Sequence, residues 1–442
     1  MKALGIDLGT TKVAAVIYDK NTGLEAVASQ PHNAAENNSD PTIFEQDVSK
    51  ITHCVDQLIS LLPEKSLAEI SAIGVTGQMH SLLLKNGKNV SPLVTWQDRR
   101  CGQALLDVFN RQSKLDLHEG FGGTTLARLA QSGELTSSMQ AATISDFLTM
   151  QLSGNQQVIT DPTHAASWGI YDLERKEWNY SAIESLNIPA AVLPEIRPGG
   201  SVIGTVTAEY SGKYNLPGNT KIVNAIGDNQ ASIIGTGNDF EHEIYLTLGT
   251  GAQLSMVCDD IPEKLPVNIE LRPFPGNRQL MVSAPLCGGA AFAVLADTIN
   301  NFRAALGEEK LERGKLLDKL DACGMEYIQK HGEPDITVNP HFLGERYAPD
   351  LRGSIHGLTL DNAIPGALAA ALALGIVRNL KKDFPPEVMQ SRQVVIGSGN
   401  AVRLIKSIQY AIEKEFSLPL VLSQGREEAA VGAARQAIAA LR

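Results

Sequence analysis

Apolar residues near the N-terminus recur with the spacing of β-strands in two runs, ALGID and KVAAVIYD, which are separated by a turn around Gly9. Residues 41–62 instead carry apolar side chains at helical spacing, and Thr42 with Glu45 has the arrangement of a capping box. A β-branched run, ISAIGVTG, follows and ends at Gly77. The pattern therefore predicts the order strand, turn, strand, strand, helix, strand for this part of the chain.

A similar order of elements recurs in the second half of the chain. IYLTLGTGAQLSMVCD predicts a strand, a Gly-Thr turn and a second strand. QLMVSAP predicts another strand, which leads through Gly288 and Gly289 into the helical stretch AAFAVLADTINNF. Either the chain contains a duplicated unit whose two hairpin turns clamp phosphates, or it contains two unrelated α/β domains, and the pattern alone favours neither.

The rest of the second half predicts three more helices, from PGALAAALALGIVRNLKK, AVRLIKSIQYAIEKEF and EEAAVGAARQAIAAL, which we assign to the second domain. We place the domain boundary near residues 233–240, after the strand KIVNAIG. The predicted domains are residues 1–236 and 237–442.

Length, composition and charge favour a globular protein and argue against several other classes. A chain of 442 residues exceeds one compact core, and its 43% hydrophobic and 20% charged content is that of a globular protein. No apolar run approaches the ~20 residues of a membrane span, and the N-terminus lacks the pattern of a secretory signal, so we expect a cytoplasmic protein without a membrane partner. The net charge of -11, without a basic run, argues against nucleic acid. The five cysteines are widely spaced and contain no C-x-x-C pair, which argues against a disulfide framework and a zinc site.

Three glycine-rich junctions between strands and turns are candidates for phosphate binding. The first combines Gly9, Thr10 and Thr11, whose amides and hydroxyls suit a phosphate, with the carboxylate of Asp7 beside them. The second is the Gly-Thr turn of the later hairpin. The third, at residues 397–399, has small side chains that let a ligand approach the backbone at the start of a helix.

Asp228 follows an apparently buried strand in IVNAIGDNQASIIG, which predicts a carboxylate at a strand end. Phosphoryl transfer requires a carboxylate that takes or orients the proton of the acceptor hydroxyl, together with a metal ion and donors for the phosphates. Asp7 and Asp228 fit a division into metal holder and base. The alternative is that Asp228 only caps the following helix.

A second polar cluster follows in the first domain. GVTGQMHS places Gln78, Met79 and His80 after a strand, and LVTWQDRRC adds Trp96 and Asp98. Amide, imidazole and carboxylate groups bind sugar hydroxyls, and an aromatic face covers the C–H surface of a sugar. A histidine bonded within the core and a tryptophan used for packing are the structural alternatives.

The chain resembles the FGGY carbohydrate kinases of the actin-like, ribonuclease-H-like ATPase superfamily. The matching segments span nearly the whole chain in the family's order: GIDLGTT, GVTGQMHS, TWQDRR, AASWGIYDL, GDNQAS, LTLGTGAQL, LGERYAPDLRG, IGSGNA and EEAAVGAA. The resemblance implies an α/β fold of two ribonuclease-H-like lobes around a central cleft, with sugar bound mainly by the first lobe, ATP mainly by the second, and Mg²⁺ as the metal.

The resemblance also implies roles for individual residues. Asp228 corresponds to the catalytic base and Asp7 to the carboxylate near the magnesium. The remaining positions fall into three groups: the phosphate loops with Thr10, Thr11, Gly249 and Thr250; the adenosine-side segments with Gly289, Gly399 and Asn400; and the sugar pocket with Met79, His80, Trp96, Asp98 and Asn229. Gln78 joins the sugar pocket through the polar cluster.

The chain departs from the family after GTT, where a Ser-x-Lys or Ser-x-Arg is usual and Lys12, Val13 and Ala14 stand here. In a strand, Lys12 and Ala14 point to one face and Val13 to the other. We expect the long side chain of Lys12 to reach the phosphates, and a lysine at position 14 to substitute for it. The alternative is a solvent-exposed Lys12 without a specific contact.

The finer pattern VTWQDRRC, GFGGTT, AASWGIYD and FLGERYAPD is most similar to the family members that act on sedoheptulose. The expected reaction is therefore the ATP-dependent phosphorylation of sedoheptulose to sedoheptulose 7-phosphate. The alternatives are a kinase for xylulose, ribulose or a related polyol, and a non-catalytic actin-like nucleotide switch. Composition leaves a homodimer open.

Overall fold

The computed structural model describes residues 1–249, 251–262, 264–345, 347–423 and 425–442. The chain divides into two compact units. The first unit contains Met1–Thr236, Pro273–Asn277 and Gly425–Arg442, and the second contains Gly237–Arg272 and Arg278–Gln424.

The first unit is built on a seven-stranded sheet in which three antiparallel strands are followed by parallel ones and, at the edge, by one more antiparallel strand. Its main path runs in the order β14 (Val202–Thr205), β15 (Lys221–Val223), β5 (Ile70–Gly77), β1 (Lys2–Leu8), β2 (Lys12–Asp19) and β3 (Gly23–Pro31), and β16 (Ile226–Gly227) also pairs with β5. The strands β1, β2 and β3 are antiparallel neighbours, and β5 and β15 continue the sheet in parallel with β1.

The sheet of the second unit shares the central part of this topology. Its order is β19 (Ile269–Phe274), β20 (Arg278–Ser283), β18 (Ala252–Cys258), β17 (Glu243–Leu248), β23 (Val394–Ser398) and β24 (Leu420–Leu422). The strands β20, β18 and β17 are antiparallel, and β23 and β24 continue in parallel with β17. The two sheets therefore share three antiparallel strands followed by two parallel ones, which supports the duplicated unit over two unrelated domains.

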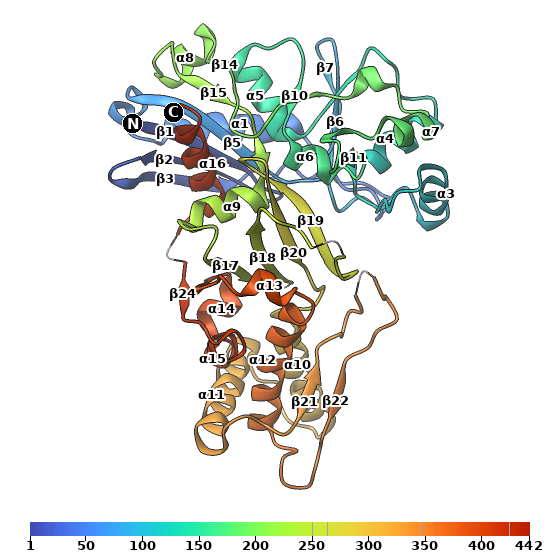
Figure 1. The fold of residues 1–442 in the computed structure, drawn as a ribbon, viewed down its shortest axis with the longest axis vertical. Helices are drawn as coiled ribbons and strands as arrows, with labels where there is room; N and C mark the ends of the chain where they lie inside the picture. The colour runs from blue at the N-terminus through green and yellow to red at the C-terminus, as the bar shows by residue number, and fades with distance from the viewer. Residues whose placement is uncertain (250, 263, 346, 424) are drawn as a thin grey trace. The chain divides into compact units, whose positions relative to one another are not determined.

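Helices of both units flank the strands, and some of them lie against the two main sheets (Figure 1). Those of the first unit are α1 (Val48–Ser60), α2 (Glu64–Leu67), α3 (Gln103–Ser113), α4 (Gly122–Gln131), α5 (Ile144–Ser153), α6 (Pro162–Ser167), α7 (Tyr180–Ser185), α8 (Ala208–Tyr214), α9 (Asp228–Thr236) and α16 (Glu428–Ala439). Those of the second unit are α10 (Ala290–Ala305), α11 (Arg313–His331), α12 (Pro365–Lys381), α13 (Pro386–Met389), α14 (Asn400–Leu404) and α15 (Lys406–Phe416). None of the helices in the described residues combines the length and apolar character needed to cross a bilayer.

Short strands complete the fold outside the two main sheets. They pair as β4 (Glu45–Gln46) with β8 (Leu93–Val94), β6 (Leu83–Asn86) with β7 (Asn89–Val90) and β9 (Gln140–Ala142), β10 (Ile159–Thr160) with β13 (Glu195–Ile196), β11 (Tyr171–Asp172) with β12 (Glu177–Trp178), and β21 (Thr337–Asn339) with β22 (Ser354–His356).

The C-terminal helix α16 packs on the sheet of the first unit, so our assignment of its residues to the second domain is wrong. Figure 1 shows this red helix against the blue strands β1 and β2. The contact is close because a Cβ atom at Gly5 or Gly74 would lie 2.0 Å from a backbone oxygen of α16. Small residues on both sides, rather than sequence proximity, therefore decide where the last helix binds.

The first predicted helix is shorter than its apolar pattern. The helix predicted over residues 41–62 begins only at Val48, because Asp47 caps it, and the residues of β4 pair with the distant strand β8 instead. The Thr42 hydroxyl donates to Asp40, so the capping box predicted at Thr42 is wrong. Pairing with a distant segment here overrides the local periodicity.

Candidate functional site

Asp228 lies at the junction between strand β16 and helix α9 and is the first residue of that helix. The strand β16 pairs in parallel with the end of β5, so Asp228 follows the carboxyl ends of parallel strands. The amide of Gly227, just before it, donates a 2.7 Å hydrogen bond to Thr163 Oγ1. This location suits a proton acceptor at a strand end, and the helix start also favours a negative charge.

Asp7 lies near the end of β1, on the face of the sheet that α16 covers. Strand alternation gives it the same side as Ala3, which packs against α16. Its Oδ1 atom is buried and has no hydrogen-bond partner among the described residues. Burial raises the pKa of Asp7 to about 7, with additional raising by the charges of Asp228 and Glu427 and partial lowering by Lys12. The carboxylate is therefore short of compensating positive charge.

Side chains from other segments hold the predicted phosphate turn in place. The carbonyl oxygen of Thr10 accepts hydrogen bonds from Gln46 Nε2 at 2.7 Å and from His32 Nε2 at 3.0 Å. His32 Nδ1 accepts from the amide of Ala34, so Nε2 carries the proton, and burial lowers the pKa of His32 and keeps it neutral. The hydroxyl of Thr10 accepts from Trp96 Nε1 at 3.0 Å. The turn is consequently tied to segments far from it in sequence, whereas Thr11 at its tip is exposed.

Lys12 forms an ion pair with Glu427, the residue just before α16. Lys12 Nζ lies 2.7 Å from both carboxylate oxygens of Glu427, and the two side chains are 48% and 12% exposed, respectively. Glu427 has φ 54° and ψ 54°, a left-handed conformation that is uncommon outside glycine and asparagine. Lys12 is therefore exposed, as the alternative expects, but it has a specific partner, and its contact with the phosphates stays a prediction.

The alternation predicted for β2 is confirmed. Ala14 packs with Ala430 of α16, on the side where Lys12 meets Glu427, whereas Val13 belongs to the cluster on the opposite face. Ala14 has no exposed surface. A lysine there would have to displace the packing against α16, but it would lie directly opposite the Asp7 carboxyl on β1, so the expectation that position 14 can carry the cation stays a prediction.

Gln78 and Met79 lie in the interior at the end of β5. Gln78 Nε2 donates to Gln46 Oε1 at 2.9 Å, and Gln78 Oε1 is buried without a partner among the described residues. Because Gln46 also holds the carbonyl of Thr10, a continuous polar chain connects Gln78 to the phosphate turn. Met79 lies against Gly227, where a Cβ atom would come within 2.7 Å of its sulfur.

His80 has an unusual backbone conformation, with φ 67°. Its amide donates to Ser167 Oγ at 3.0 Å, its Nδ1 lies 2.6 Å from the Ser167 carbonyl oxygen, and its ring stacks on Phe121 at 4.7 Å between centroids. The Nδ1 atom therefore carries a proton, which it donates to that carbonyl. Phe121 therefore contacts one face of the imidazole, and the Ser167 carbonyl oxygen accepts from one of its nitrogens.

The other predicted sugar-pocket residues differ in how far they are engaged by the protein. Trp96 is 49% exposed, although its indole N–H donates to Thr10. Asp98 is 5% exposed, and its carboxylate accepts hydrogen bonds from the Arg100 guanidinium and the Phe44 amide. Asn229 is the second residue of α9, directly after Asp228. Trp96 thus has free surface for a ligand, whereas Asp98 primarily connects two loops.

The predicted nucleotide segments of the second unit meet in the structure. The amide of Gly289 donates to the carbonyl oxygen of Gly249 at 3.0 Å. A Cβ atom at Gly399 would lie 2.3 Å from the carbonyl oxygen of Leu248, and φ of Gly399 is +87°, so only glycine fits this approach. Thr250, the other predicted residue of this loop, lies outside the described residues. The segments around Gly249, Gly289 and Gly399 therefore form one local cluster in the second unit.

Two helices begin at this cluster, and they differ in length. Gly289 caps α10, a helix of 16 residues, whereas Asn400 opens α14, which has 5. The predicted helix from AVRLIKSIQYAIEKEF is thus interrupted at Ile405, which has φ -101° and ψ 108° and separates α14 from α15. A helix as short as α14 adds little dipole, so its start offers close backbone approach rather than charge.

The two sheets, with three antiparallel strands followed by two parallel ones, define the ribonuclease-H-like fold of the actin-like ATPases. Residues 2–235 match the N-terminal domain of the FGGY family of carbohydrate kinases. This match covers more than half of the chain, which therefore belongs to the FGGY family of carbohydrate kinases and is a carbohydrate kinase.

Relatives extend this result over the full length. The sedoheptulokinase of Homo sapiens is 31% identical over 468 aligned residues, covering 98% of this chain and 96% of its own. A glycerol kinase of Alteromonas mediterranea is 27% identical and covers 84% of this chain and 76% of its own. The solved structure of xylulose kinase from Rhodospirillum rubrum has a TM-score of 0.83 at 20% identity, covering 99% of this chain and 89% of that chain, which shows the shared fold.

Several residues that surround the predicted site were not singled out by the sequence. Gln46 and His32 hold the phosphate turn, and Glu427 holds Lys12. Gln46 lay inside a stretch that looked helical, and Glu427 lay within the quoted segment EEAAVGAA, which is the one signal that pointed to it. Each acts through a contact across at least 22 residues of sequence, which periodicity does not detect.

Proposed function

We propose that this carbohydrate kinase transfers the γ-phosphoryl group of ATP to sedoheptulose and forms sedoheptulose 7-phosphate. The observation that carries the choice of sugar is the 31% identity to human sedoheptulokinase over 98% of the chain. The finer sequence pattern around Trp96 and Trp168 agrees with this choice. The site residues support the reaction type through the carboxylates of Asp228 and Asp7 in the first unit and the glycine-rich cluster in the second.

In this proposal Asp228 takes the proton of the acceptor hydroxyl as the oxygen forms its bond to phosphorus. An oriented carboxylate is the main covalent assistance that phosphoryl transfer requires, since the remaining catalysis is positioning and charge stabilisation. The bond between the γ-phosphorus and the bridging oxygen breaks, and ADP leaves. Asn229, Met79, His80 and Trp96 bind the sugar beside this carboxylate, with Gln78 supporting the turn beneath.

The donor set fits a divalent cation. Asp7 has a buried oxygen without a partner in the described part of the chain, and its pKa is raised to about 7 by burial and neighbouring negative charge. Mg²⁺ prefers one or two carboxylates together with substrate phosphates, and Asp7 would hold it in that manner. The cation would offset the charge of the phosphates, while Thr10 and Thr11 offer hydroxyls and amides to them.

The nucleotide is assigned to the second unit. Gly249, Gly289 and Gly399 form the local cluster described above, and Thr250 and Asn400 adjoin it in sequence. Backbone that lacks Cβ atoms can approach a phosphate or a ribose closely, and the 16-residue helix α10 begins there with its amides unpaired by the helix itself. This cluster therefore supports the phosphate and adenosine contacts of ATP.

We expect sedoheptulose to have the highest kcat/KM in a panel of acceptors containing sedoheptulose, xylulose, ribulose and glycerol. The reason is that a pocket shaped for a seven-carbon ketose uses binding energy along the whole chain of hydroxyls. The measurement is ADP release in a coupled assay, with phosphorus NMR of the product to identify the position of the phosphate.

An Asp228→Asn sample supplies the background of ATP hydrolysis for this panel. A pentulose that exceeds sedoheptulose by tenfold, about 1.4 kcal/mol of transition-state discrimination, would contradict the choice of sugar and leave the kinase activity intact. ATP hydrolysis that no acceptor stimulates would contradict the catalytic proposal as a whole and favour a nucleotide switch.

We expect Lys12→Ala to raise KM for ATP and lower kcat together, with the affinity for sugar unchanged. Lys12 is the cation beside the phosphate turn, and in this proposal its ammonium leaves Glu427 for the phosphates when ATP binds. Steady-state kinetics with ATP and sugar varied separately give both constants.

Glu427→Gln is the matched control, because it removes the ion pair and retains Lys12. We expect this variant to keep KM for ATP at or below that of the parent protein. An equal rise of KM in both variants would assign Lys12 a structural role as the partner of Glu427.

A further inference from the structure

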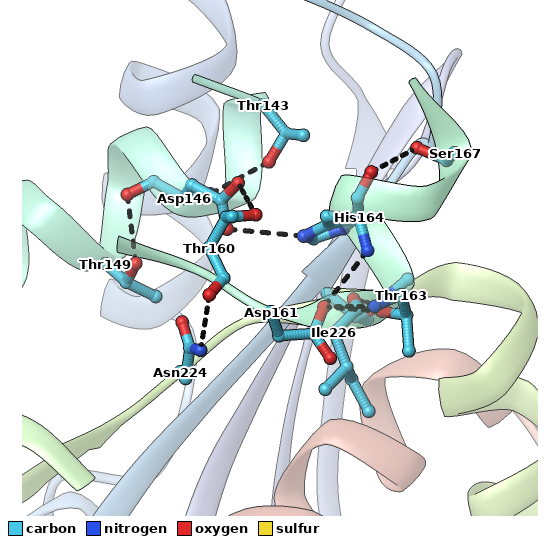
Figure 2. Close-up of polar contacts among 12 residues, drawn as sticks. Thr143, Asp146, Thr149, Thr160, Asp161, Thr163, His164, Ser167, Asn224 and Ile226 are labelled. Carbon is cyan, nitrogen blue, oxygen red and sulfur yellow. Dashed lines mark hydrogen bonds and ion pairs between the residues drawn. The ribbon is translucent and has the colours of Figure 1, made fainter. Parts of the chain in front are cut away.

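A polar cluster that the reaction scheme does not use is buried in the first unit beside Asp228. His164 and Asp146 have no exposed surface, and His164 Nδ1 lies 3.2 Å from Asp146 Oδ1 (Figure 2). Asp161, 1% exposed, lies in the same cluster and caps the helix that carries His164. A buried ion pair is seldom more stable than an apolar substitute of the same volume, so such a cluster suggests a role in geometry.

One end of the short helix α6 holds the backbone beside Asp228. Thr163 Oγ1 donates to Asp161 Oδ1 at 2.6 Å and accepts from the Gly227 amide at 2.7 Å. Because the orientation of that hydroxyl is fixed by Asp161, its lone pair is aimed at Gly227. The residue that follows Gly227 is the proposed base, so any displacement of α6 moves the Asp228 backbone.

The other end of α6 holds the backbone of His80. Ser167 Oγ donates to the His164 carbonyl oxygen at 2.7 Å and accepts from the His80 amide at 3.0 Å. The Ser167 carbonyl oxygen accepts from His80 Nδ1 at 2.6 Å. His80 has φ 67°, a conformation that costs energy in a residue with a side chain and persists only where neighbours enforce it. Ser167, through its hydroxyl and its carbonyl oxygen, is one such neighbour.

His164 fastens α6 to helix α5. A helix of 6 residues has little stability of its own, so its position depends on contacts from its sides. Asp146 of α5 bonds His164 through Oδ1 and the Thr160 hydroxyl through Oδ2, the latter at 2.8 Å. Burial lowers the pKa of His164, but the charges of Asp146, Asp161 and Asp228 outweigh burial and raise it. The contact is therefore strengthened by charge.

We propose that His164 is a positioning residue for the phosphoryl transfer: fastened by Asp146, it fixes α6 so that Thr163 holds the backbone at Asp228 and Ser167 holds His80. This inference rests on the proposed roles of Asp228 as base and His80 as sugar ligand. It adds to them a single element that sets the distance between base and acceptor, because both ends of α6 move together.

Steady-state kinetics of variants at each end of α6 distinguish the roles of the two ends. Thr163→Val, which breaks the bond to Gly227, should lower kcat about tenfold with little change in KM for sugar. Ser167→Ala, which breaks the bond from the His80 amide and keeps the backbone carbonyl that accepts from His80 Nδ1, should raise KM for sugar about fivefold to tenfold with kcat within a factor of about three. His164→Leu should do both, and lower kcat by roughly 10²-fold, the loss expected for a displacement near 1 Å. His164→Asn retains an N–H near the Nδ1 position and should recover most of the activity.

Thr149→Val is the control for a buried polar change on α5, since its hydroxyl donates only to the carbonyl of Asp146 within the same helix. The dissociation constant for ADP, measured by calorimetry, should be that of the parent protein in every variant. If His164→Leu does not fold, Thr163→Val and Ser167→Ala carry the test. The proposal is overturned if His164→Leu has parental constants, or if Thr163→Val and Ser167→Ala change kcat and KM alike. An inactive parent protein would instead overturn the proposed function.

Discussion

Asp228→Asn is expected to lower kcat by roughly 10²-fold to 10⁴-fold while the fold and nucleotide binding persist. The amide has the size of the carboxylate but cannot take a proton from the acceptor hydroxyl. Asp228 follows β16 at a backbone position that Thr163 fixes through Gly227, so the substitution changes chemistry at an unchanged location. The measurements are kcat at saturating ATP and sugar, circular dichroism, and calorimetric binding of ADP.

Asp116→Asn is the matched control, because the Asp116 side chain is 90% exposed and belongs to the same unit. It should have the turnover of the parent protein. A turnover of Asp228→Asn within a factor of about three of the parent protein would remove Asp228 from the mechanism, and its role would be that of a stabilising charge at the start of α9.

Asp7→Asn is expected to raise the free energy of unfolding of the first unit at pH 8 by about 2–4 kcal/mol. It is also expected to abolish most of the kinase activity of the protein. The pKa of Asp7 is raised to about 7 in the folded protein by burial and by Asp228 and Glu427, from an ordinary value of 3.8. Each pKa unit corresponds to about 1.4 kcal/mol, so ionising this carboxyl opposes folding by that amount for every unit by which its pKa is raised. Asparagine avoids the charge, but it also removes the carboxylate proposed to hold Mg²⁺.

The sign of the pH dependence follows from the raised pKa. Below pH 3.8 both the folded and the unfolded chain hold the proton, and Asp7 does not oppose folding. As pH rises towards 7, the unfolded chain releases the proton first, so the folded state loses stability over this window. Above it the penalty is constant. The advantage of Asp7→Asn should therefore be small near pH 4 and complete at pH 8.

Urea unfolding followed by tryptophan fluorescence, with a chelator present, measures the change in stability of the first structural unit, which contains Asp7. The protein has three tryptophans, and Trp96, Trp168 and Trp178 all lie in the first unit. Asp19→Asn provides the opposite sign, because hydrogen bonds led by the Asn21 amide lower the pKa of Asp19, and its contribution to stability is lost as pH falls. Equal free energies of unfolding of Asp7→Asn and the parent protein at pH 8 would show that the ionised Asp7 does not destabilise the folded protein.

Long, strongly periodic segments were predictable because their signal is local. The strands β1, β2 and β5 and the helices α10 and α12 appear where the spacing of apolar residues puts them, since period and burial agree over each segment. The candidate site residues also lie in the local settings that the sequence predicts: Asp228 at a strand end, and Gly249, Gly289 and Gly399 at glycine-rich junctions. Their types and spacing are properties of short stretches of sequence.

Pairing between distant segments was not predictable from the same signals. Residues 45–46 carry helical periodicity but pair with β8, and α16 follows the second unit in sequence but packs on the first. In both cases a contact with a remote segment buries more surface or satisfies more backbone than the local alternative.

The sequence by itself determined the class of fold, the family and the candidate site residues, because each is encoded in short motifs and local periodicity. Only the tertiary structure decided how these residues are supported: Gln46 beneath Thr10, Glu427 against Lys12 across 415 residues, and His164 on Asp146. Such contacts depend on which strands and helices become neighbours. Polar side chains that meet in the interior must satisfy one another there, and a linear pattern does not state which of them will meet.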